Sequence, residues 1–301
     1  MLARMQQLTT FLLIAAALGW VAWWFASDAP LVAAAGGILI LYVHAPVLAL
    51  EFALAHWVNR HDPAPRASAA QMVRAWWAEV RTTPAIFCWR QPFASHAVPD
   101  HLPPDARGRR AFVFVHGFVC NRGFWTPWLN PLRRTGRPFV AVNLEPVFGT
   151  IDDYIPIIDK AVSQAEAATG LAPVLVCHSM GGLAARAWLA RGRNRQRAAH
   201  VITIGSPHRG TWLSRFARSP NASQMRPDCD WLCQLAAAED RTTAHGAAIT
   251  CWYSSADNIV FPASTATLPG ADNRFLPGVA HVCMAFDTRV IDHALRVIDS
   301  Q

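Results

Sequence analysis

Two long apolar runs set the first sixty residues apart from the rest of the chain. Residues 8–26 are apolar except for two threonines, and residues 31–50 are apolar except for His44. Each run approaches the roughly 20 residues that an α-helix needs to cross a bilayer. A short polar turn at 27–30 separates the runs, and tryptophans at positions 20, 23 and 24 precede it, as in an interfacial aromatic belt. The pattern predicts a two-helix transmembrane hairpin.

Two other interpretations of the apolar runs stay open. The first run resembles a signal peptide, although no small-x-small cleavage site precedes Asp28. The second run suits a buried helix of a soluble core, but its length and lack of charge argue against this. Arg4 before the hairpin, with Arg60 and Arg66 after it, favours cytoplasmic termini. We therefore expect a multi-pass protein of the inner (cytoplasmic) membrane whose main domain faces the cytoplasm, whereas a single span would reverse that orientation.

The second apolar run carries two polar side chains on one helical face. His44 and Glu51 are seven positions apart, which is nearly two helical turns. Polar groups inside a membrane often mark a functional site. Glu51 lies close to the end of the run, however, and His44 is readily neutral. Packing between helices, or a position at the interface, is therefore the preferred interpretation of both.

Prolines mark the following stretch as a connector. Pro63 and Pro65 end the helical pattern, and further prolines at 99, 103 and 104 precede the main domain. Between them, residues 68–80 have the spacing of a short amphipathic helix, with two adjacent tryptophans available for packing. We expect a membrane anchor at 1–60, a connector at 61–105 and a single large domain at 106–301.

The large domain alternates between short apolar strands and helices. Strands are predicted at residues 111–115, 140–144, 174–177, 200–204 and 248–253, and helices at 154–169, 183–191 and 287–299. This alternation is typical of a mostly parallel sheet with helices on both faces. Residues 207–245 leave the strand pattern and carry apolar side chains. A lid with an apolar inner face and an insertion packed onto the domain both explain that segment.

Charge and cysteine content narrow the partners. The formal net charge of +7 comes from arginine, since Lys160 is the only lysine. No nucleic-acid motif accompanies the charge, so we expect no nucleic-acid partner. Anionic lipid headgroups and a solvated arginine-rich surface both explain it. The seven cysteines lack metal-ligand spacing, so we expect no metal and mostly free thiols. A disulfide between Cys229 and Cys233 depends on local geometry.

The clearest chemical signal follows the strand at 174–177. The chain continues there as His-Ser-Met-Gly-Gly, residues 178–182, and then becomes helical. This is the strand-turn-helix context of a nucleophile elbow, in which a sharp turn lifts a serine hydroxyl above the sheet. Ser179 also lies at a helix N-terminus, whose dipole favours developing negative charge. Cys177 replaces the first glycine of the G-x-S-x-G pattern, and a simple tight turn is the alternative interpretation.

A nucleophilic serine needs a base and a residue that orients the base. Asp257 lies just beyond the strand at 248–253, and His281 lies in a loop before the final helix. The order Ser179, Asp257, His281 is the chain order of an α/β-hydrolase triad. His208, which closely follows a strand, is the competing base. Asp272 is the alternative acid, although it lies close to His281 in sequence.

Together these segments resemble bacterial lipases of the α/β-hydrolase family, from about residue 111 to the C-terminus. The matching segments are His-Gly-Phe at 116–118, Ser-Met-Gly-Gly at 179–182, Ile-Gly-Ser-Pro-His-Arg-Gly-Thr at 204–211, and the segments around Asp257 and His281. The resemblance implies an α/β-hydrolase fold with an oxyanion hole formed by the backbone amides of Phe118 and Met180. It also implies a structural role for the segment that contains His208, which favours His281 as the base, and a reaction without metal or organic cofactor.

The resemblance and the apolar runs lead to three functional hypotheses. The first is a membrane-anchored lipase or carboxylesterase that acts on acyl or lipid esters through an acyl-enzyme on Ser179. The second is an acyltransferase, phospholipase or thioesterase with the same triad. The third is a non-catalytic lipid-binding membrane protein, against which the complete triad argues. We expect a lipid or ester substrate and membrane lipids as partners, with no obligate protein partner, while the fold leaves the substrate undetermined.

Overall fold

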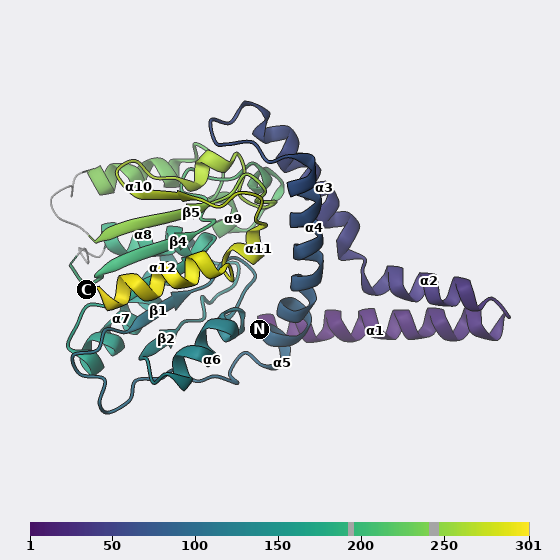
Figure 1. The fold of residues 1–301 in the computed structure, drawn as a ribbon, viewed down its shortest axis with the longest axis horizontal. Coiled ribbons are helices and arrows are strands. Elements are labelled where there is room, and N and C mark those ends of the chain that lie inside the picture. The colour runs from purple at the N-terminus through teal and green to yellow at the C-terminus, as the bar shows by residue number, and fades with distance from the viewer. Residues whose placement is uncertain (192–195, 241–246, 301) are drawn as a thin grey trace.

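A parallel sheet of six strands forms the centre of the molecule (Figure 1). The computed structural model describes residues 1–191, 196–240 and 247–300. The strand order is β2-β1-β3-β4-β5-β6, and every neighbouring pair is parallel. The strands are β1 Phe112–Val115, β2 Phe139–Ala141, β3 Val174–His178, β4 His200–Ile204, β5 Ala248–Tyr253 and β6 Asp272–Phe275. The predicted α/β architecture with a parallel sheet is therefore confirmed.

The sixth strand was not predicted from the sequence. β6 reads Asp-Asn-Arg-Phe and lies at the edge of the sheet, where it pairs with β5 from Thr250↔Asp272 to Tyr253↔Phe275. Its first two residues are exposed. An edge strand tolerates polar and charged side chains because one side has no partner strand. It therefore lacks the apolar run by which the other five were recognised.

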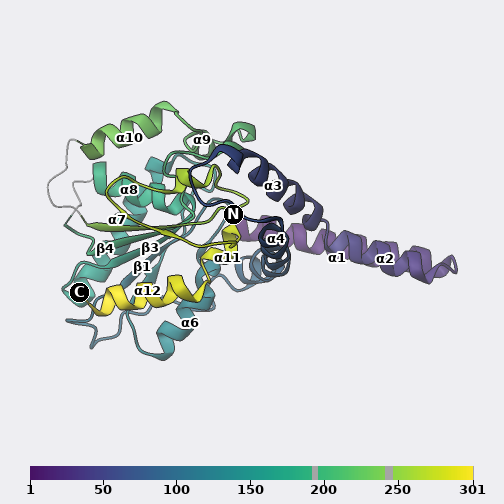
Figure 2. The same ribbon diagram turned by 45° about the horizontal axis from the view of Figure 1, so that its top comes forward.

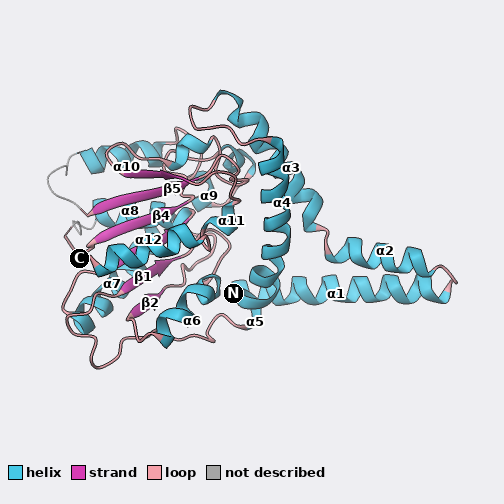
Figure 3. Cartoon of the chain, in the orientation of Figure 1, coloured by secondary structure: helices cyan, strands magenta, loops and turns pink. Residues whose placement is uncertain are grey.

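Helices cover both faces of the sheet (Figure 3). Alternate residues of β1 point to opposite faces, so Val113 and Val115 belong to one apolar core and Phe112 and Phe114 to the other. The first core includes α7 Ile155–Thr169 and α8 Met180–Arg191, and the second includes α6 Thr126–Arg134 and α12 Thr288–Asp299. Burial on both faces explains why the central strands are continuously apolar.

The insertion between β4 and β5 contains η5 Trp212–Phe216, α9 Pro220–Ser223 and α10 Asp230–Asp240. Trp231, Leu232 and Leu235 of α10 are buried in the same core as α8. Of the two interpretations of this segment, a lid and an insertion packed onto the domain, the packed insertion describes α10. Phe216 differs, because 70% of its surface is exposed. The seven cysteines, including Cys229 and Cys233, are free thiols.

The N-terminal helices α1 Leu2–Ala26 and α2 Pro30–Leu41 lie side by side and extend away from the sheet domain (Figures 1 and 2). We call them the hairpin. α1 is long and apolar enough to cross a membrane, and few of its residues are buried. The second apolar run is not one straight helix, since α2 and the following α3 His44–Val58 are bent by 53°. The described chain therefore has one candidate membrane span, α1. It has two if the bent pair α2 and α3 together forms a second span.

The helix after the bend packs on protein. His44 Nε2 lies 3.1 Å from the Val80 carbonyl oxygen, and Trp76 donates a 2.9 Å hydrogen bond to the Ala45 carbonyl. Both partners come from α4 Ala69–Pro84, which follows the short η1 Asn59–His61. Phe52 is buried with residues of the sheet domain. We call α3, η1 and α4 the N-terminal arm. η2 Ala85–Arg90, α5 Gln91–Phe93 and η4 Ile151–Tyr154 are short turns of helix, as are η3 Arg122–Trp125, η6 Ala263–Ala266 and α11 His281–Met284.

Candidate active site

Ser179 occupies the turn between β3 and α8, with a φ of 55°. A left-handed backbone is unusual for a residue other than glycine and is typical of strained functional turns. The Ser179 N–H donates a 2.9 Å hydrogen bond to the Ile204 carbonyl at the end of β4. This bond holds the turn against the neighbouring strand. Ser179 therefore has the backbone geometry of a nucleophile elbow.

Glycines allow the surrounding loops to approach this turn. A Cβ on Gly117, just after β1, would lie 2.8 Å from the Ser179 Cβ. A Cβ on Gly181 would lie 2.6 Å from the Val115 carbonyl oxygen, and one on Gly182 would lie 2.2 Å from Ser206 Oγ. No side chain fits at these distances. The small residues of the predicted motif are thus explained by the close contact of β1, β4 and the start of α8.

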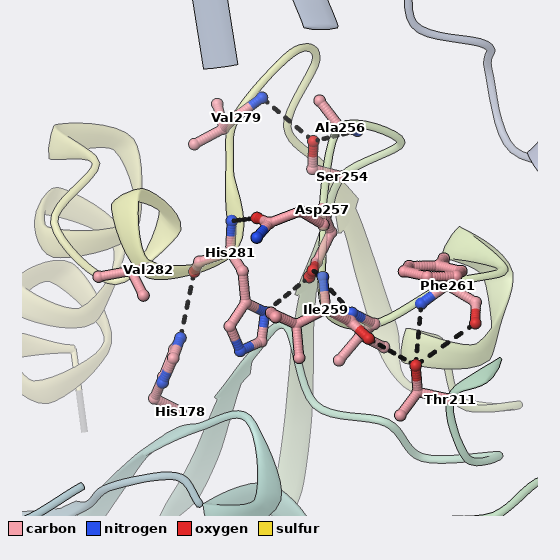
Figure 4. Close-up of polar contacts among 12 residues, drawn as sticks. His178, Thr211, Ser254, Ala256, Asp257, Ile259, Phe261, Val279, His281 and Val282 are labelled. Atoms are coloured by element: carbon pink, nitrogen blue, oxygen red, sulfur yellow. Dashed lines mark hydrogen bonds and ion pairs between the residues drawn. The ribbon is translucent and has the colours of Figure 1, made fainter. Parts of the chain in front are cut away.

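Asp257 and His281 form a buried pair (Figure 4). Asp257 Oδ2 lies 2.9 Å from His281 Nδ1. The other oxygen, Oδ1, accepts hydrogen bonds of 2.8 Å from the backbone N–H groups of Ile259 and Val260. The carboxylate is therefore fixed in orientation. It in turn fixes the plane of the imidazole and favours the proton of the neutral pair on Nδ1, which leaves Nε2 unprotonated.

Gly205 connects this pair to the serine turn. It follows β4 directly, and its φ of 55° is one that glycine adopts without strain. A Cβ there would lie 3.0 Å from Asp257 Oδ2 and 3.1 Å from His281 Nδ1. The preceding residue, Ile204, accepts the hydrogen bond of Ser179. The structure thus brings the three predicted triad residues to the same carboxyl edge of the sheet: Ser179 follows β3, Asp257 follows β5 and His281 follows β6.

Two further histidines hold the loops around the turn. His178 stacks on Phe124 with ring centroids 4.6 Å apart, and its Nε2 lies 3.1 Å from the His281 carbonyl oxygen. Burial, followed by the charge of His281, places the pKa of His178 well below the ordinary value. His116 accepts a hydrogen bond from the Leu144 N–H, and burial lowers its pKa to about 4. Both are neutral residues that support the surrounding loops.

The predicted oxyanion amides belong to residues that flank the serine turn. Met180 is the first residue of α8, and Phe118 follows Gly117. Within the described part of the chain, no acceptor receives a hydrogen bond from the Phe118 N–H. The Phe118 ring packs edge-on against Phe148, with centroids 5.9 Å apart. Val119, the next residue, has a φ of 52°, so a strained turn orients this amide.

Two polar side chains of the site, Glu79 and Asn258, were not predicted from the sequence, and a third, Glu51, was interpreted only as a packing or interface residue. Glu79 of α4 is 1% exposed and accepts hydrogen bonds from the N–H groups of Val282 (2.9 Å) and Cys283 (3.2 Å). Asn258 donates a hydrogen bond to Glu51 and accepts one from the N–H of His281, so it connects Glu51 to the same loop. One signal was available: Glu79 follows Met72 by seven residues, so it falls on the apolar face of the predicted amphipathic helix.

The carboxylates set the charge state of His281. Burial by itself would lower the His281 pKa, but Asp257, then Glu79 and Glu51, raise it above the ordinary value of 6.5. Burial raises the pKa of Glu79 in turn, although its two backbone hydrogen bonds oppose this. The site thus surrounds one imidazole with three carboxylates. Such a surrounding stabilises an imidazolium.

The alternative base and acid lie elsewhere. His208 is buried, with Nε2 2.9 Å from Thr203 Oγ1, and its carbonyl accepts a 2.9 Å hydrogen bond from Arg186. Arg186 also pairs with Glu239 of α10 at 2.6 Å. Asp272 is exposed on β6 and pairs with Arg274 at 2.6 Å. In the described ranges, no group of three or more His, Cys, Asp or Glu side chains is arranged to hold a metal ion.

The chain belongs to the alpha/beta hydrolase family, whose profile matches residues 112–293. The mature form of the Bacillus licheniformis lipase BlEst2 is similar, with a TM-score of 0.55 and 16% identity over 65% of this chain and 95% of that chain. Its propeptide form gives a TM-score of 0.54 and 16% identity over 66% of this chain and 52% of that chain. At these identities the similarity concerns the fold. No curated protein sequence matches the chain.

Proposed function

We propose that this protein is a membrane-anchored serine hydrolase that cleaves carboxylic ester bonds, as a lipase or carboxylesterase does. One observation carries the proposal. The Asp257–His281 pair, joined at 2.9 Å, lies beside a serine whose φ is 55° at the carboxyl edge of the sheet. A buried acid–base pair next to a strained serine turn is the arrangement that activates a serine hydroxyl.

The proposed reaction begins with acylation of Ser179. His281 Nε2 takes the hydroxyl proton while Ser179 Oγ attacks the ester carbonyl carbon, and Asp257 stabilises the imidazolium. The Phe118 and Met180 amides donate to the oxyanion, and each such donor lowers the barrier by about 3 kcal/mol. The tetrahedral intermediate then collapses. The alcohol leaves with the proton from His281, and the acyl group stays on Ser179.

Deacylation repeats these steps with water. His281 removes a proton from water, and the resulting hydroxide attacks the acyl carbon under the same two amides. Ser179 Oγ is released and regains its proton from His281, while the acid departs. No step calls for a metal or organic cofactor. The family to which the chain belongs and the lipase with the similar fold support this type of reaction.

The hairpin supports an ester of lipid character. Its exposed side chains are large and apolar, among them Leu12, Leu18, Leu31 and Leu39, and an exposed apolar surface of this kind favours a lipid environment. We propose that the hairpin anchors the enzyme in the inner membrane as a multi-pass segment. The exposed Arg4 lies at the start of α1, and the exposed Arg60 and Arg66 follow the hairpin, which favours a cytoplasmic catalytic domain. In this proposal the anchor lies within residues 1–60 and ends before α3, which packs on the sheet domain, while residues 61–105 and 106–301 serve as connector and catalytic domain.

Other uses of the same triad compete with ester hydrolysis. Acyl transfer to an acceptor other than water, phospholipid cleavage and thioester cleavage all begin with the same acyl-enzyme. A lipid-binding protein without catalysis is the remaining class. Product analysis with and without an added alcohol separates transfer from hydrolysis. Substrate panels that contain phospholipids and thioesters separate the others.

The test of the nucleophile uses the full chain in detergent. Wild type, Ser179→Ala and Ser206→Ala are labelled with a fluorophosphonate, and hydrolysis of short-chain and long-chain p-nitrophenyl esters is measured in the same samples. Ser206 is the matched control because it is buried at the end of the adjacent strand β4. We expect labelling and turnover to disappear in Ser179→Ala alone. If folded wild type neither labels nor turns over, also with lipid vesicles present, the hydrolase proposal is wrong.

Anchoring is tested separately. Alkaline carbonate should leave the full chain in the membrane fraction and release a variant without residues 2–43. One reporter is inserted at residues 27–30 and another is fused to the C-terminus. If the hairpin spans the membrane twice, the two reporters lie in opposite compartments; if it spans only once, they lie in the same compartment. Release of the full chain by carbonate would contradict the anchor.

A further inference from the structure

The short helix that begins at His281 lacks a cap of its own. α11 spans His281–Met284, and its N-cap residue, Ala280, provides no side-chain hydrogen bond. The first N–H groups of a helix need acceptors from outside it. Glu79 supplies them through both oxygens, to Val282 at 2.9 Å and to Cys283 at 3.2 Å. A residue 203 positions earlier in the chain thus performs the role that the N-cap normally has.

A second carboxylate reaches the same loop through an amide. Glu51 Oε2 accepts a 2.8 Å hydrogen bond from Asn258 Nδ2. The other end of that side chain, Asn258 Oδ1, accepts the N–H of His281 at 3.3 Å. Asn258 is 1% exposed. The N-terminal arm therefore holds three consecutive N–H groups of this loop. Glu79 accepts those of Val282 and Cys283 directly, and Glu51 holds that of His281 through Asn258.

The arm approaches the active-site edge of the sheet. Figures 1 and 2 both show α4 beside α11, away from the opposite edge where the strands begin. α4 is joined to α3 through His44 and Trp76, and α3 carries Glu51. Neither carboxylate lies within the range that matches the family, residues 112–293. Both therefore belong to the part of the chain that precedes the family match.

We propose that Glu79 is a positioning residue for His281, assisted by Glu51 through Asn258, and that the N-terminal arm completes the active site. The inference rests on the proposed function, in which His281 is the base. Fixing the first turn of α11 fixes the backbone from which the imidazole projects, and so keeps its Nδ1 on Asp257. An imidazole that is already held in one orientation loses less conformational entropy when the transition state forms.

The two carboxylates also act through charge. The titratable groups that face His281 are Asp257 after β5, His178 at the end of β3, Glu79 of α4 and Glu51 of α3. The thiol of Cys283 lies next to Glu79. A negative charge favours the protonated imidazole, so each of these groups, in its ionised form, moves the loss of activity in acid to higher pH; burial raises the pKa of Glu51 itself to about 6. The negative charge also stabilises the imidazolium that forms as Ser179 attacks.

The test compares variants of the full chain in detergent. Glu79→Gln removes the charge and one of the two acceptor oxygens. Glu79→Asp keeps the charge but shortens the side chain, whereas Glu51→Gln removes the charge and keeps an acceptor for Asn258. Glu145→Gln, an exposed site, is the matched control. The readouts are kcat, KM and the pH at which kcat/KM is half-maximal on the acid side, all normalised to the fraction of sites titrated by fluorophosphonate.

Positioning and charge predict different results. We expect kcat to fall about tenfold or more in both Glu79 variants, with KM nearly unchanged. The acid half-maximum should move down by about 0.5 to 1 pH unit in Glu79→Gln and Glu51→Gln and stay at the wild-type value in Glu79→Asp. A purely structural role would reduce only the titrated fraction. Wild-type kcat in both Glu79 variants, together with an unmoved acid half-maximum in both glutamine variants, overturns the proposal.

The His281 pKa measured by imidazole NMR separates this proposal from the proposed function. Wild type that neither labels nor hydrolyses esters counts against the hydrolase only. In that case, a lower His281 pKa in Glu79→Gln and Glu51→Gln still supports the coupling between the arm and His281. An identical pKa in the wild type and both variants overturns it.

Discussion

Asp257 Oδ2 lies 2.9 Å from His281 Nδ1, although 24 residues separate them in the chain. The acid follows β5, and the histidine begins α11 after the chain has passed through the edge strand β6. Two backbone N–H groups fix the other oxygen of Asp257. The pair is therefore oriented before any substrate arrives. Several consequences can be measured once an ester substrate is identified.

Asp257→Asn should lower kcat by about 10³- to 10⁴-fold with little loss of stability. The amide is the same size but its NH₂ group cannot accept from His281 Nδ1, so the imidazole adopts the wrong tautomer. Steady-state kinetics and thermal unfolding of the same samples provide the check. If Asp272→Asn causes the loss and Asp257→Asn does not, the acid has been assigned to the wrong residue.

The pH dependence of kcat/KM follows from the charge on His281. The base acts in its neutral form, and neighbouring carboxylates raise its pKa above 6.5. The rate should therefore fall as the pH decreases through a midpoint above 6.5. A profile from pH 5 to 9 measures that midpoint. Full activity maintained down to pH 5.5 would contradict the assignment of His281.

Gly205→Ala should damage the site beyond its cost in backbone strain. The new Cβ would lie 3.0 Å from Asp257 Oδ2 and 3.1 Å from His281 Nδ1. We expect a loss of about 1–2 kcal/mol in the free energy of unfolding and about a tenfold lower kcat. Gly270→Ala is the control, since its φ is 75° and nothing lies within 4 Å of the added Cβ. Equal kcat values for the two variants would show that the contact is unimportant.

His208 and His281 should respond differently to asparagine. His281→Asn should abolish fluorophosphonate labelling because Ser179 loses its base. His208→Asn should retain labelling but reduce the free energy of unfolding by about 1–3 kcal/mol, since the buried Thr203 hydroxyl loses the nearer of its two partners. Labelling kinetics and thermal unfolding distinguish the two roles. Loss of labelling in a folded His208→Asn would make His208 the base.

Two truncations separate the hairpin from the arm. Removing residues 2–43 keeps α3, whereas removing 2–67 also deletes Phe52 and the hydrogen bonds of Asn59 to Ser255 and Ala263. We expect the longer deletion to cost roughly 4 kcal/mol more of unfolding free energy, from one buried phenylalanine and two buried hydrogen bonds. Denaturant unfolding in matched detergent measures the difference. Equal stability would mean that α3 does not support the domain.

Local pattern allowed much of this protein to be predicted. Five strands are short apolar runs whose burial on both faces is visible in the sequence itself. The serine turn was recognisable because strand, small residues and helix follow one another within a few positions. Chain order was enough to predict that Asp257 and His281 lie together, because parallel strands bring their carboxyl ends to one edge. All of these signals lie within a single element or the loop beside it.

Other features depend on contacts between distant segments. β6 is a strand because β5 offers it a partner, not because Asp-Asn-Arg-Phe favours a strand. The bend between α2 and α3 falls between Leu41 and His44, within a run that is apolar except for His44, so the hydropathy of the run does not predict a bend there. α3 packs against α4 and the sheet domain, whereas α2 lies against α1.

The sequence by itself determined the strand–helix alternation, the serine turn and the order of the triad, because each follows from neighbouring residues. Only the tertiary structure decided which groups surround His281. Glu79 lies more than two hundred positions before the N–H groups that donate to it, and Glu51 reaches His281 through Asn258. A buried carboxylate is stable there only because three-dimensional packing supplies its hydrogen bonds. No local pattern encodes those partners.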